Sequence, residues 1–321
     1  MSKNFWKQLK KPIMALAPLD DVTDSAFREI IAKYGKPDVM YTEFTSADGL
    51  ANAEGRKRLI HDLRYSQSER PIIAQFFGAE PRHFETAARL AVELGFDGVD
   101  INMGCPVHDV CKSCAGSALI QDPTLAQKII LAAKKGAGDL PVSVKTRAGY
   151  NKDNIEEWIG ALLEAKPAAI VLHARTKKEM SKVPARWELV GQAVAVRDAK
   201  KSETLILGNG DVRDLAHAKK LCEKYGADGA MIGRAIFGNP WLFSGRDVAS
   251  ISLKEKLTVL REHVLLYDKH LGGIKPFDFM RKHFKSYMEG FSGAKAYRAK
   301  FMVTKDAEET VKLLDDAIAA E

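Results

Sequence analysis

The stretch GVDINMGCP, residues 98–106, decides the fold because it shows a unit that the chain repeats. A short apolar, β-branched run, residues 98–101, ends in the polar residue Asn102, and a turn rich in small residues follows. Comparable runs occur at residues 13–17, 39–41, 72–74, 98–101, 142–144, 169–172, 204–207 and 229–232. Runs of this length and composition are typical of buried parallel strands.

Segments with helical apolar spacing lie between these runs, at residues 81–94, 123–135, 154–165, 187–196 and 212–225. Eight strand–helix units within one domain-sized region predict the α/β class and a closed (β/α)8 TIM barrel. The alternative is an open doubly wound sheet, which needs a glycine-rich dinucleotide-binding turn after the first strand. LAPLDDVTD, residues 16–24, is not such a turn.

After residue 250 the strand pattern stops, and three helical stretches follow at residues 254–273, 276–293 and 294–321. We therefore expect two domains, a catalytic barrel at residues 1–250 and an all-helical domain at residues 251–321. In the middle stretch one side is apolar and is expected to face the core: Phe277, Met280, Phe284, Tyr287, Met288 and Phe291. Arg281, Lys282 and Lys285 lie beside that stripe and form a candidate contact surface.

Composition favours a cytoplasmic globular protein with a polyanionic partner. Lys and Arg number 49 against 42 Asp and Glu, for a net charge of +7, and residues 269–305 hold nine of these bases against two acids. No run approaches the roughly 18 apolar residues of a membrane helix. Four cysteines in 321 residues do not form a dense disulfide framework.

Nearly every apolar run ends in a polar residue that can do chemistry. In a closed barrel these positions converge on the carboxyl-terminal rim, where catalytic groups sit. The rim set is Glu43, Gln75, Asn102, Lys145, His173, Asn209 and Arg234.

Cys105, Cys111 and Cys114 cluster after the fourth run, yet their spacing matches neither structural zinc nor an iron–sulfur signature. We therefore expect no metal. Cys111 and Cys114 have the spacing of a redox pair but lack a thioredoxin-like context, so we expect them to be unreactive. Cys105 lies between Gly104 and Pro106, a geometry that presents a functional thiol at the rim.

The last two strand runs lead into GNGDV, residues 208–212, and IGRAIFGNP, residues 232–240. Backbone N–H groups of residues 209–211 and of Gly233, with the Arg234 guanidinium, are suited to a phosphate monoester at helix starts. The rest of such a ligand would lie over the barrel mouth, and flavin mononucleotide (FMN) fits that arrangement.

Several motifs, in order and at compatible spacing, together resemble the FMN-dependent tRNA-dihydrouridine synthase family. They are APLDDVTDSAFREI (17–30), YTEFTSADGL (41–50), AQFFG (74–78), DINMGCP (100–106), AGSALIQDP (115–123), VSVKTRAG (142–149), LHARTKKE (172–179), GNGDV (208–212), IGRAIFGNPW (232–241) and MRKHFKSYMEG (280–290). The resemblance covers nearly the whole chain.

This resemblance implies a flavoenzyme that reduces uridines in tRNA to 5,6-dihydrouridine. Hydride would pass from NADPH through bound FMN to C6, and Cys105 would protonate C5. The implied cofactor contacts are Pro18, Leu19, Asp20, Gln75, Lys145, His173, Asn209, Gly210, Asp211, Gly233 and Arg234. The implied substrate contacts are Asn102, Arg175, Arg281, Lys282, Lys285 and Arg298. The implied partner is tRNA, with no membrane and no metal.

The first motif departs from the family pattern, because Asp20 and Asp21 stand where a proline, methionine, alanine, glycine run is usual. We expect two acids at these positions to change the contacts of residues 19–21 with the flavin ring and to alter the redox potential of the flavin. Two alternatives stay open: an FMN-dependent reductase of a free pyrimidine or enone, resembling dihydroorotate dehydrogenase, and a non-catalytic RNA-binding protein. The basic C-terminal region disfavours the first, and Cys105 with the polar rim disfavours the second.

Overall fold

The computed structural model describes residues 4–321, and these form two compact units. The first, which we call the barrel unit, comprises residues 4–18, 38–64 and 70–233. The second, the helical unit, comprises residues 19–37, 65–69 and 234–321. The expected domains, 1–250 and 251–321, place residues 19–37, 65–69 and 234–250 differently, and their assignment as a catalytic and a tRNA-binding domain stays a prediction.

The barrel unit contains one sheet of parallel strands in the order β1-β9-β8-β7-β6-β5-β4-β2. Their bounds are β1 Ile13–Leu16, β2 Met40–Tyr41, β4 Ile72–Phe77, β5 Gly98–Met103, β6 Val142–Arg147, β7 Ala169–His173, β8 Leu205–Asn209 and β9 Gly229–Ile232. All eight predicted strands are thus confirmed. One short strand, β3 (Thr45–Ser46), was not predicted and pairs with β4.

The sheet closes nearly completely between its first and last members. Ala15 of β1 forms a parallel bridge with Val39, the Leu16 N–H donates to the Val39 carbonyl at 3.0 Å, and the Asp38 N–H donates to the Met14 carbonyl at 2.9 Å. The predicted TIM-barrel class is therefore confirmed.

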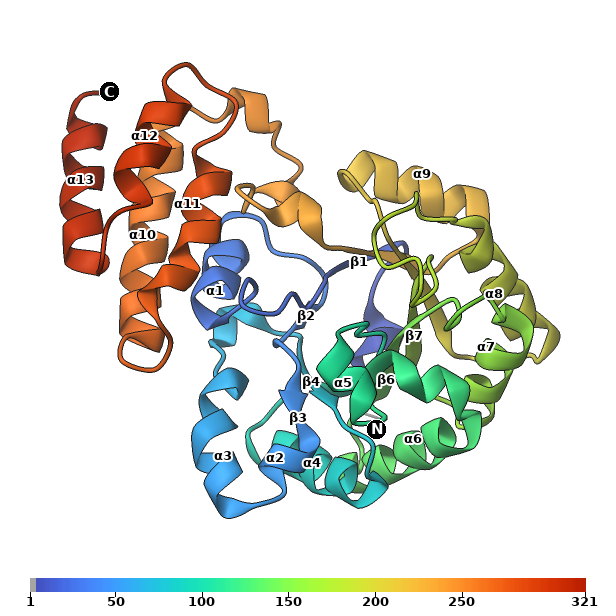
Figure 1. Cartoon of the computed structure of the whole chain (residues 1–321). Helices are drawn as coiled ribbons and strands as arrows, with labels where there is room; N and C mark the ends of the chain where they lie inside the picture. Colours follow the sequence, from blue (N-terminus) through green and yellow to red (C-terminus); the bar gives the residue numbers. More distant parts are fainter. Residues whose placement is uncertain (1–3) are drawn as a thin grey trace. The chain divides into compact units, whose positions relative to one another are not determined.

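Helices surround the strands of the barrel unit, as Figure 1 shows for α4 and α6 to α9. Their bounds are α2 Ala47–Leu50, α3 Ala53–Leu59, α4 Pro81–Glu93, α5 His108–Lys112, α6 Pro123–Ala137, α7 Ile155–Glu164, α8 Glu188–Ala199 and α9 Leu215–Tyr225. Local sequence explains their ends. The Asp214 carboxylate accepts from the His217 N–H at 2.7 Å and begins α9, while Gly226, with φ 68°, ends it.

The helical unit consists of α1 (Ser25–Tyr34), α10 (Leu253–Leu271), α11 (Arg281–Tyr287), α12 (Ala294–Phe301) and α13 (Ala307–Ala319). The last expected helix, residues 294–321, is in fact α12 and α13, because the Asp306 side chain caps a new helix. The apolar stripe is confirmed as core: Met280, Phe284, Tyr287 and Met288 are buried, and the two ends are half-buried. In the part of the chain that the structure describes, no helix has both the length and the apolar character of a membrane span.

Candidate active site

Strand register sets four predicted rim residues of the barrel unit in two pairs, and the second pair is level with Arg147, two residues beyond Lys145. Asn102 of β5 pairs with Lys145 of β6, and His173 of β7 pairs with Asn209 of β8. Because parallel strands of a barrel end at the same rim, these side chains come from the end at which ligands bind. Of the predicted set, Arg234 falls in the helical unit.

Cys105 lies on a tight turn that Asn102 organises. The Asn102 Oδ1 accepts from the Gly104 N–H at 3.0 Å and from the Cys105 N–H at 2.9 Å. Its Nδ2 donates to Gln75 Oε1 at 3.1 Å. These three hydrogen bonds of the buried Asn102 side chain fix the cysteine turn and link it to β4.

A second loop holds Cys105 from the other side. The Ser117 N–H donates to the Cys105 carbonyl at 3.0 Å. Gly116 has φ 59°, and a Cβ there would come within 2.9 Å of that carbonyl, so only glycine allows the approach. Cys105 is 8% exposed, and its thiol is reduced, as are those of the half-buried Cys111 and the exposed Cys114.

Lys145 supplies a cation at the rim whose proton is loosely held. Burial, with a smaller contribution from Arg147, lowers the pKa of Lys145 to about 8, while Asp100 and Cys105 act in the opposite direction. Burial also lowers the pKa of Arg147 to about 10, with a contribution from Arg175. A lysine with such a pKa both holds anionic groups and exchanges a proton near neutral pH.

The predicted phosphate side of the barrel unit is organised around Asp211. The Arg175 guanidinium donates to the Asp211 carboxylate and lies 3.0 Å, Nη1 to Nε2, from His173. Arg175 is only 2% exposed, and its Nε also donates to the Val183 carbonyl at 2.6 Å. Its guanidinium therefore interacts with groups of the protein rather than with solvent. This arrangement allows Arg175 to position His173 and Asp211, and its contact with substrate stays a prediction.

Gly210 and Asp211 both have positive φ, 118° and 51°. A Cβ on Gly210 would lie 2.8 Å from the Ala185 Cβ and 3.1 Å from the His173 Cδ2. The turn therefore approaches His173 only because residue 210 is glycine. Asn209 is anchored separately, since its Nδ2 donates to the Met231 carbonyl at 2.8 Å.

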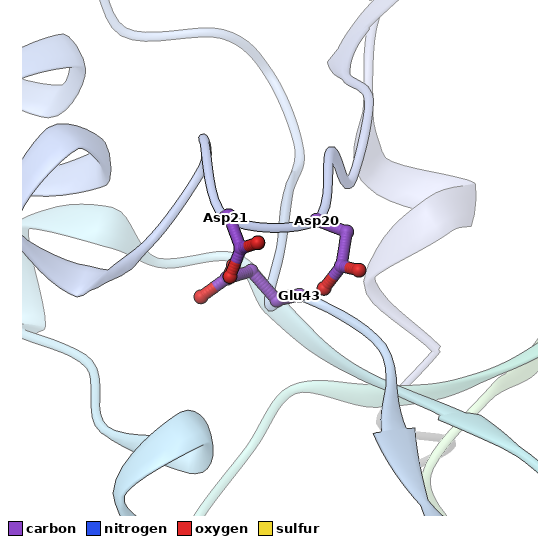
Figure 2. A group of neighbouring side chains, drawn as sticks. All are labelled: Asp20, Asp21 and Glu43. Atoms are coloured by element: carbon purple, nitrogen blue, oxygen red, sulfur yellow. The ribbon is translucent and has the colours of Figure 1, made fainter. Parts of the chain in front are cut away.

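The acidic departure in the first motif lies in the helical unit, which begins at Leu19, whereas Pro18 belongs to the barrel unit. Figure 2 shows Asp20 and Asp21 on their loop, drawn with Glu43, a buried residue that follows β2. Asp21 has φ 53°, and its carboxylate lies 3.9 Å from Lys275 Nζ and 3.6 Å from Lys282 Nζ. Two lysines of the helical unit thus neutralise Asp21.

The four basic residues proposed for substrate contact have different surroundings within the helical unit. Arg281 pairs with Asp278 at 3.0 Å, and Arg298 Nη1 donates to the Met288 carbonyl at 2.8 Å. Lys282 lies near Asp21, as described above. Lys285 is exposed on α11 and is the member of the set best placed to meet solvent.

This chain is similar to known proteins over nearly its whole length. Residues 15–321 match the family model described as "Dihydrouridine synthase (Dus)". A "Probable tRNA-dihydrouridine synthase 2" from Bacillus subtilis is 42% identical over 318 residues, covering 98% of this chain and 97% of the relative. A "Probable tRNA-dihydrouridine synthase" from Staphylococcus aureus strain MRSA252 is 42% identical over 319 residues, with coverage of 98% and 96%.

The chain belongs to the dihydrouridine synthase family. The resemblance inferred from the motifs is therefore confirmed at the level of the family. Solved structures agree on the fold: histamine dehydrogenase from Rhizobium sp. 4-9 superposes with a TM-score of 0.54 at 12% identity, over 79% of this chain and 48% of that one. An amine oxidase for 6-hydroxypseudooxynicotine from Pseudomonas geniculata N1 gives 0.55 at 13%, over 71% and 46%.

Two residues near the Cys105 turn, Asp100 and Arg147, were not predicted from the sequence. Asp100 is fully buried between Gln75 and Ser143, and the Arg147 Nε donates to the Gly104 carbonyl at 2.8 Å, next to Cys105. A charged residue inside the apolar run 98–101 is the signal that could have found Asp100. Burial raises the pKa of Asp100 to about 6, while Ser143, Gln75 and Lys145 act in the opposite direction.

Proposed function

We propose that this protein is a tRNA-dihydrouridine synthase, a flavin-dependent oxidoreductase that reduces specific uridines of tRNA with NADPH. The observation that carries the proposal is the Cys105 turn, held at the end of β5 by Asn102, in a chain of the dihydrouridine synthase family. Reduction of a C5–C6 double bond needs a hydride on one carbon and a proton on the other. The protein has to supply the proton.

The chemistry of the rim fits FMN. The Gly210 turn, where a Cβ would meet Ala185 and His173, follows β8 and would direct backbone N–H groups to a phosphate, and Lys145 is a cation suited to an electron-rich ring system. Pro18, Leu19, Asp20, Gln75, His173, Asn209, Asp211, Gly233 and Arg234 complete the proposed flavin contacts. Bound FMN would supply the hydride transfer from the nicotinamide.

The remaining roles belong to side chains of this chain. Cys105 would donate its proton to C5 as general acid, which suits a thiol with its proton in place near neutral pH. Asn102 would contact the target base while it holds the cysteine turn. Arg175 would orient His173 and Asp211, as their contacts suggest. No metal is needed for these steps.

The tRNA would be held by the helical unit, in particular by residues 251–321. Exposed Lys285, with Arg281, Lys282 and Arg298, lies in a segment of high positive charge, and phosphate contacts of this kind position an RNA without reading its sequence. The target uridine has to leave its stack to reach a recessed thiol. We place this reaction in the cytoplasm.

The test is to purify the protein, record its visible spectrum, incubate it with NADPH and tRNA lacking dihydrouridine, and weigh the nucleosides of the digested RNA. We expect flavin absorbance and a uridine that has gained two hydrogens at a mapped position. NADPH oxidation that leaves tRNA unchanged would instead favour a reductase of a free pyrimidine or enone. A colourless protein that only binds RNA would overturn the catalytic proposal.

A further inference from the structure

A line of buried polar side chains runs across β4, β5 and β6 beneath the cysteine turn. Gln75 pairs in register with Asp100, and Asp100 pairs with Ser143. Gln75, Asp100 and Ser143 are all fully buried. Residues two apart on a strand face the same side, so Asp100 and Asn102 of β5 can both reach Gln75.

The hydrogen bonds of this line form a continuous chain. Asp100 Oδ1 accepts from Ser143 Oγ at 2.5 Å, and Asp100 Oδ2 accepts from Gln75 Nε2 at 2.7 Å. Gln75 Oε1 in turn accepts from Asn102 Nδ2 at 3.1 Å. The chain ends where Asn102 Oδ1 accepts the N–H groups of Gly104 and Cys105.

The backbone N–H groups at one end of this series of hydrogen bonds and the Asp100 carboxylate at the other determine which group donates and which accepts at each step. The backbone N–H groups can only donate, so Asn102 has to turn its oxygen to them and its NH2 to Gln75. Gln75 then has to turn its own NH2 toward residue 100, which must accept. A carboxylate satisfies this requirement with either oxygen, and an apolar residue there would leave a buried NH2 group without its partner.

From this geometry we infer that Asp100 is a positioning residue, which fixes the orientation of Gln75 and, through Asn102, the place of the Cys105 thiol. The inference rests on the proposed function for its catalytic consequence, but the position of the thiol can be measured without catalysis. Its essential property is that residue 100 accepts a hydrogen bond. Negative charge at residue 100 is not essential.

Two nearly isosteric substitutions separate these properties. Asp100→Asn keeps an oxygen for Gln75 and can donate its NH2 to the Ser143 hydroxyl, which both donates and accepts. Asp100→Leu keeps the same branching and number of heavy atoms, with methyl groups that are larger than the carboxylate oxygens, and it accepts no hydrogen bond. Asp100→Val, whose β-branched side chain suits a buried strand, is a second apolar variant if Asp100→Leu fails to fold.

The readout is the rate at which iodoacetamide alkylates Cys105 in a Cys111→Ser/Cys114→Ser background, followed by peptide mass spectrometry. Cys222 is only 4% exposed, and the peptide that carries it is distinguished from that of Cys105 by mass. We expect Asp100→Leu or Asp100→Val to change the rate about tenfold, the equivalent of one net hydrogen bond of about 1.4 kcal/mol. Asp100→Asn should stay within twofold of the parent, and Ser143→Ala, which leaves the Gln75 bond intact, serves as the matched control.

Flavin content, melting temperature and dihydrouridine formation are then measured on the same variants. Loss of product in the apolar variants, with rescue by Asp100→Asn at equal flavin content, supports the inference. Equal alkylation rates in all folded variants would overturn it, and so would Asp100→Asn behaving like Asp100→Leu, since charge would then be the essential property. If the alkylation pattern is as expected but no variant or parent reduces tRNA, the proposed function fails while the positioning of Cys105 stands.

Discussion

The two units differ in whether their buried polar side chains form hydrogen bonds. In the barrel unit, Gln75, Asp100 and Asn102 are buried and each makes directional hydrogen bonds. In the helical unit, His263 of α10 and His283 of α11 are buried too, yet among residues 4–321 neither ring nitrogen of either side chain finds a hydrogen-bond partner.

The two histidines of the helical unit are instead packed as aromatic rings. Their ring centroids lie 4.5 Å apart, and both contact Phe27 of α1, at 5.0 Å from His263 and 4.6 Å from His283. A satisfied polar group fixes a direction, whereas an unsatisfied ring contributes only volume and costs desolvation free energy. The buried polar groups of the barrel unit therefore orient the side chains of its site. The buried histidines of the helical unit instead make its core sensitive to protonation.

The largest effect should follow from removing the Cys105 thiol in the barrel unit, where the buried polar groups are hydrogen-bonded. Cys105→Ala should lower dihydrouridine formation by at least about a hundredfold, the usual contribution of a general acid. Flavin content should not change, because backbone groups hold the turn. Cys114→Ala, at an exposed position, is the control. Full product formation by Cys105→Ala would remove Cys105 from the reaction.

Acid should lower the stability of the helical unit through the buried side chains of His263 and His283. Burial lowers the pKa of His283 to about 3, with Lys282 adding to the effect, and burial lowers that of His263 well below its usual range, with His283 adding. The unfolded chain binds these protons below a pKa of about 6.5 and the folded protein does not, so stability is retained above that value and falls as pH decreases. At pH 5 each histidine should cost about 2 kcal/mol.

Melting curves at pH 7 and pH 5 test this expectation. His283→Leu removes one titrating group and should lose less stability on acidification than the parent, while His108→Ala, at a side chain that is 86% exposed, should behave like the parent. Identical acid sensitivity of His283→Leu and the parent would show that the buried rings are not the sensitive groups.

A smaller effect is expected from obstructing the Gly210 turn. Gly210→Ala introduces a Cβ that would meet Ala185 and His173 at a φ of 118°, with a strain of about 1–3 kcal/mol. We expect weaker flavin retention, measured by dilution and fluorescence of released flavin. Gly138→Ala, also at positive φ but facing open space, controls for backbone strain alone. Equal flavin retention in the two variants would place the phosphate elsewhere.

The smallest effect should come from a single exposed charge of the helical unit. Lys285→Ala should weaken tRNA binding a few-fold at low salt and reduce the slope of log affinity against log salt by about one. Lys128→Ala, at an exposed lysine of α6 in the barrel unit, is the matched control. An equal loss in the control would mean that the helical unit is not the specific RNA surface.

Much of the fold and the candidate site follows from local sequence alone. Strand runs and helical spacing depend on neighbours within a few residues, so the eight strands, the barrel class and the polar strand ends were all predicted. The family also followed from sequence, because its motifs recur in order along the chain. Cys105 stood out because of the residues that flank it.

Other features depend on residues that meet only after folding. Sequence spacing could not show that Arg175 is paired with Asp211, that Asp21 lies near Lys275 and Lys282, or that α1 groups with the C-terminal helices. The chain of hydrogen bonds from Ser143 to Cys105 crosses three strands. Local pattern thus determined which elements form, and only tertiary structure decided which polar groups are satisfied, because burial and partner geometry come from long-range contacts.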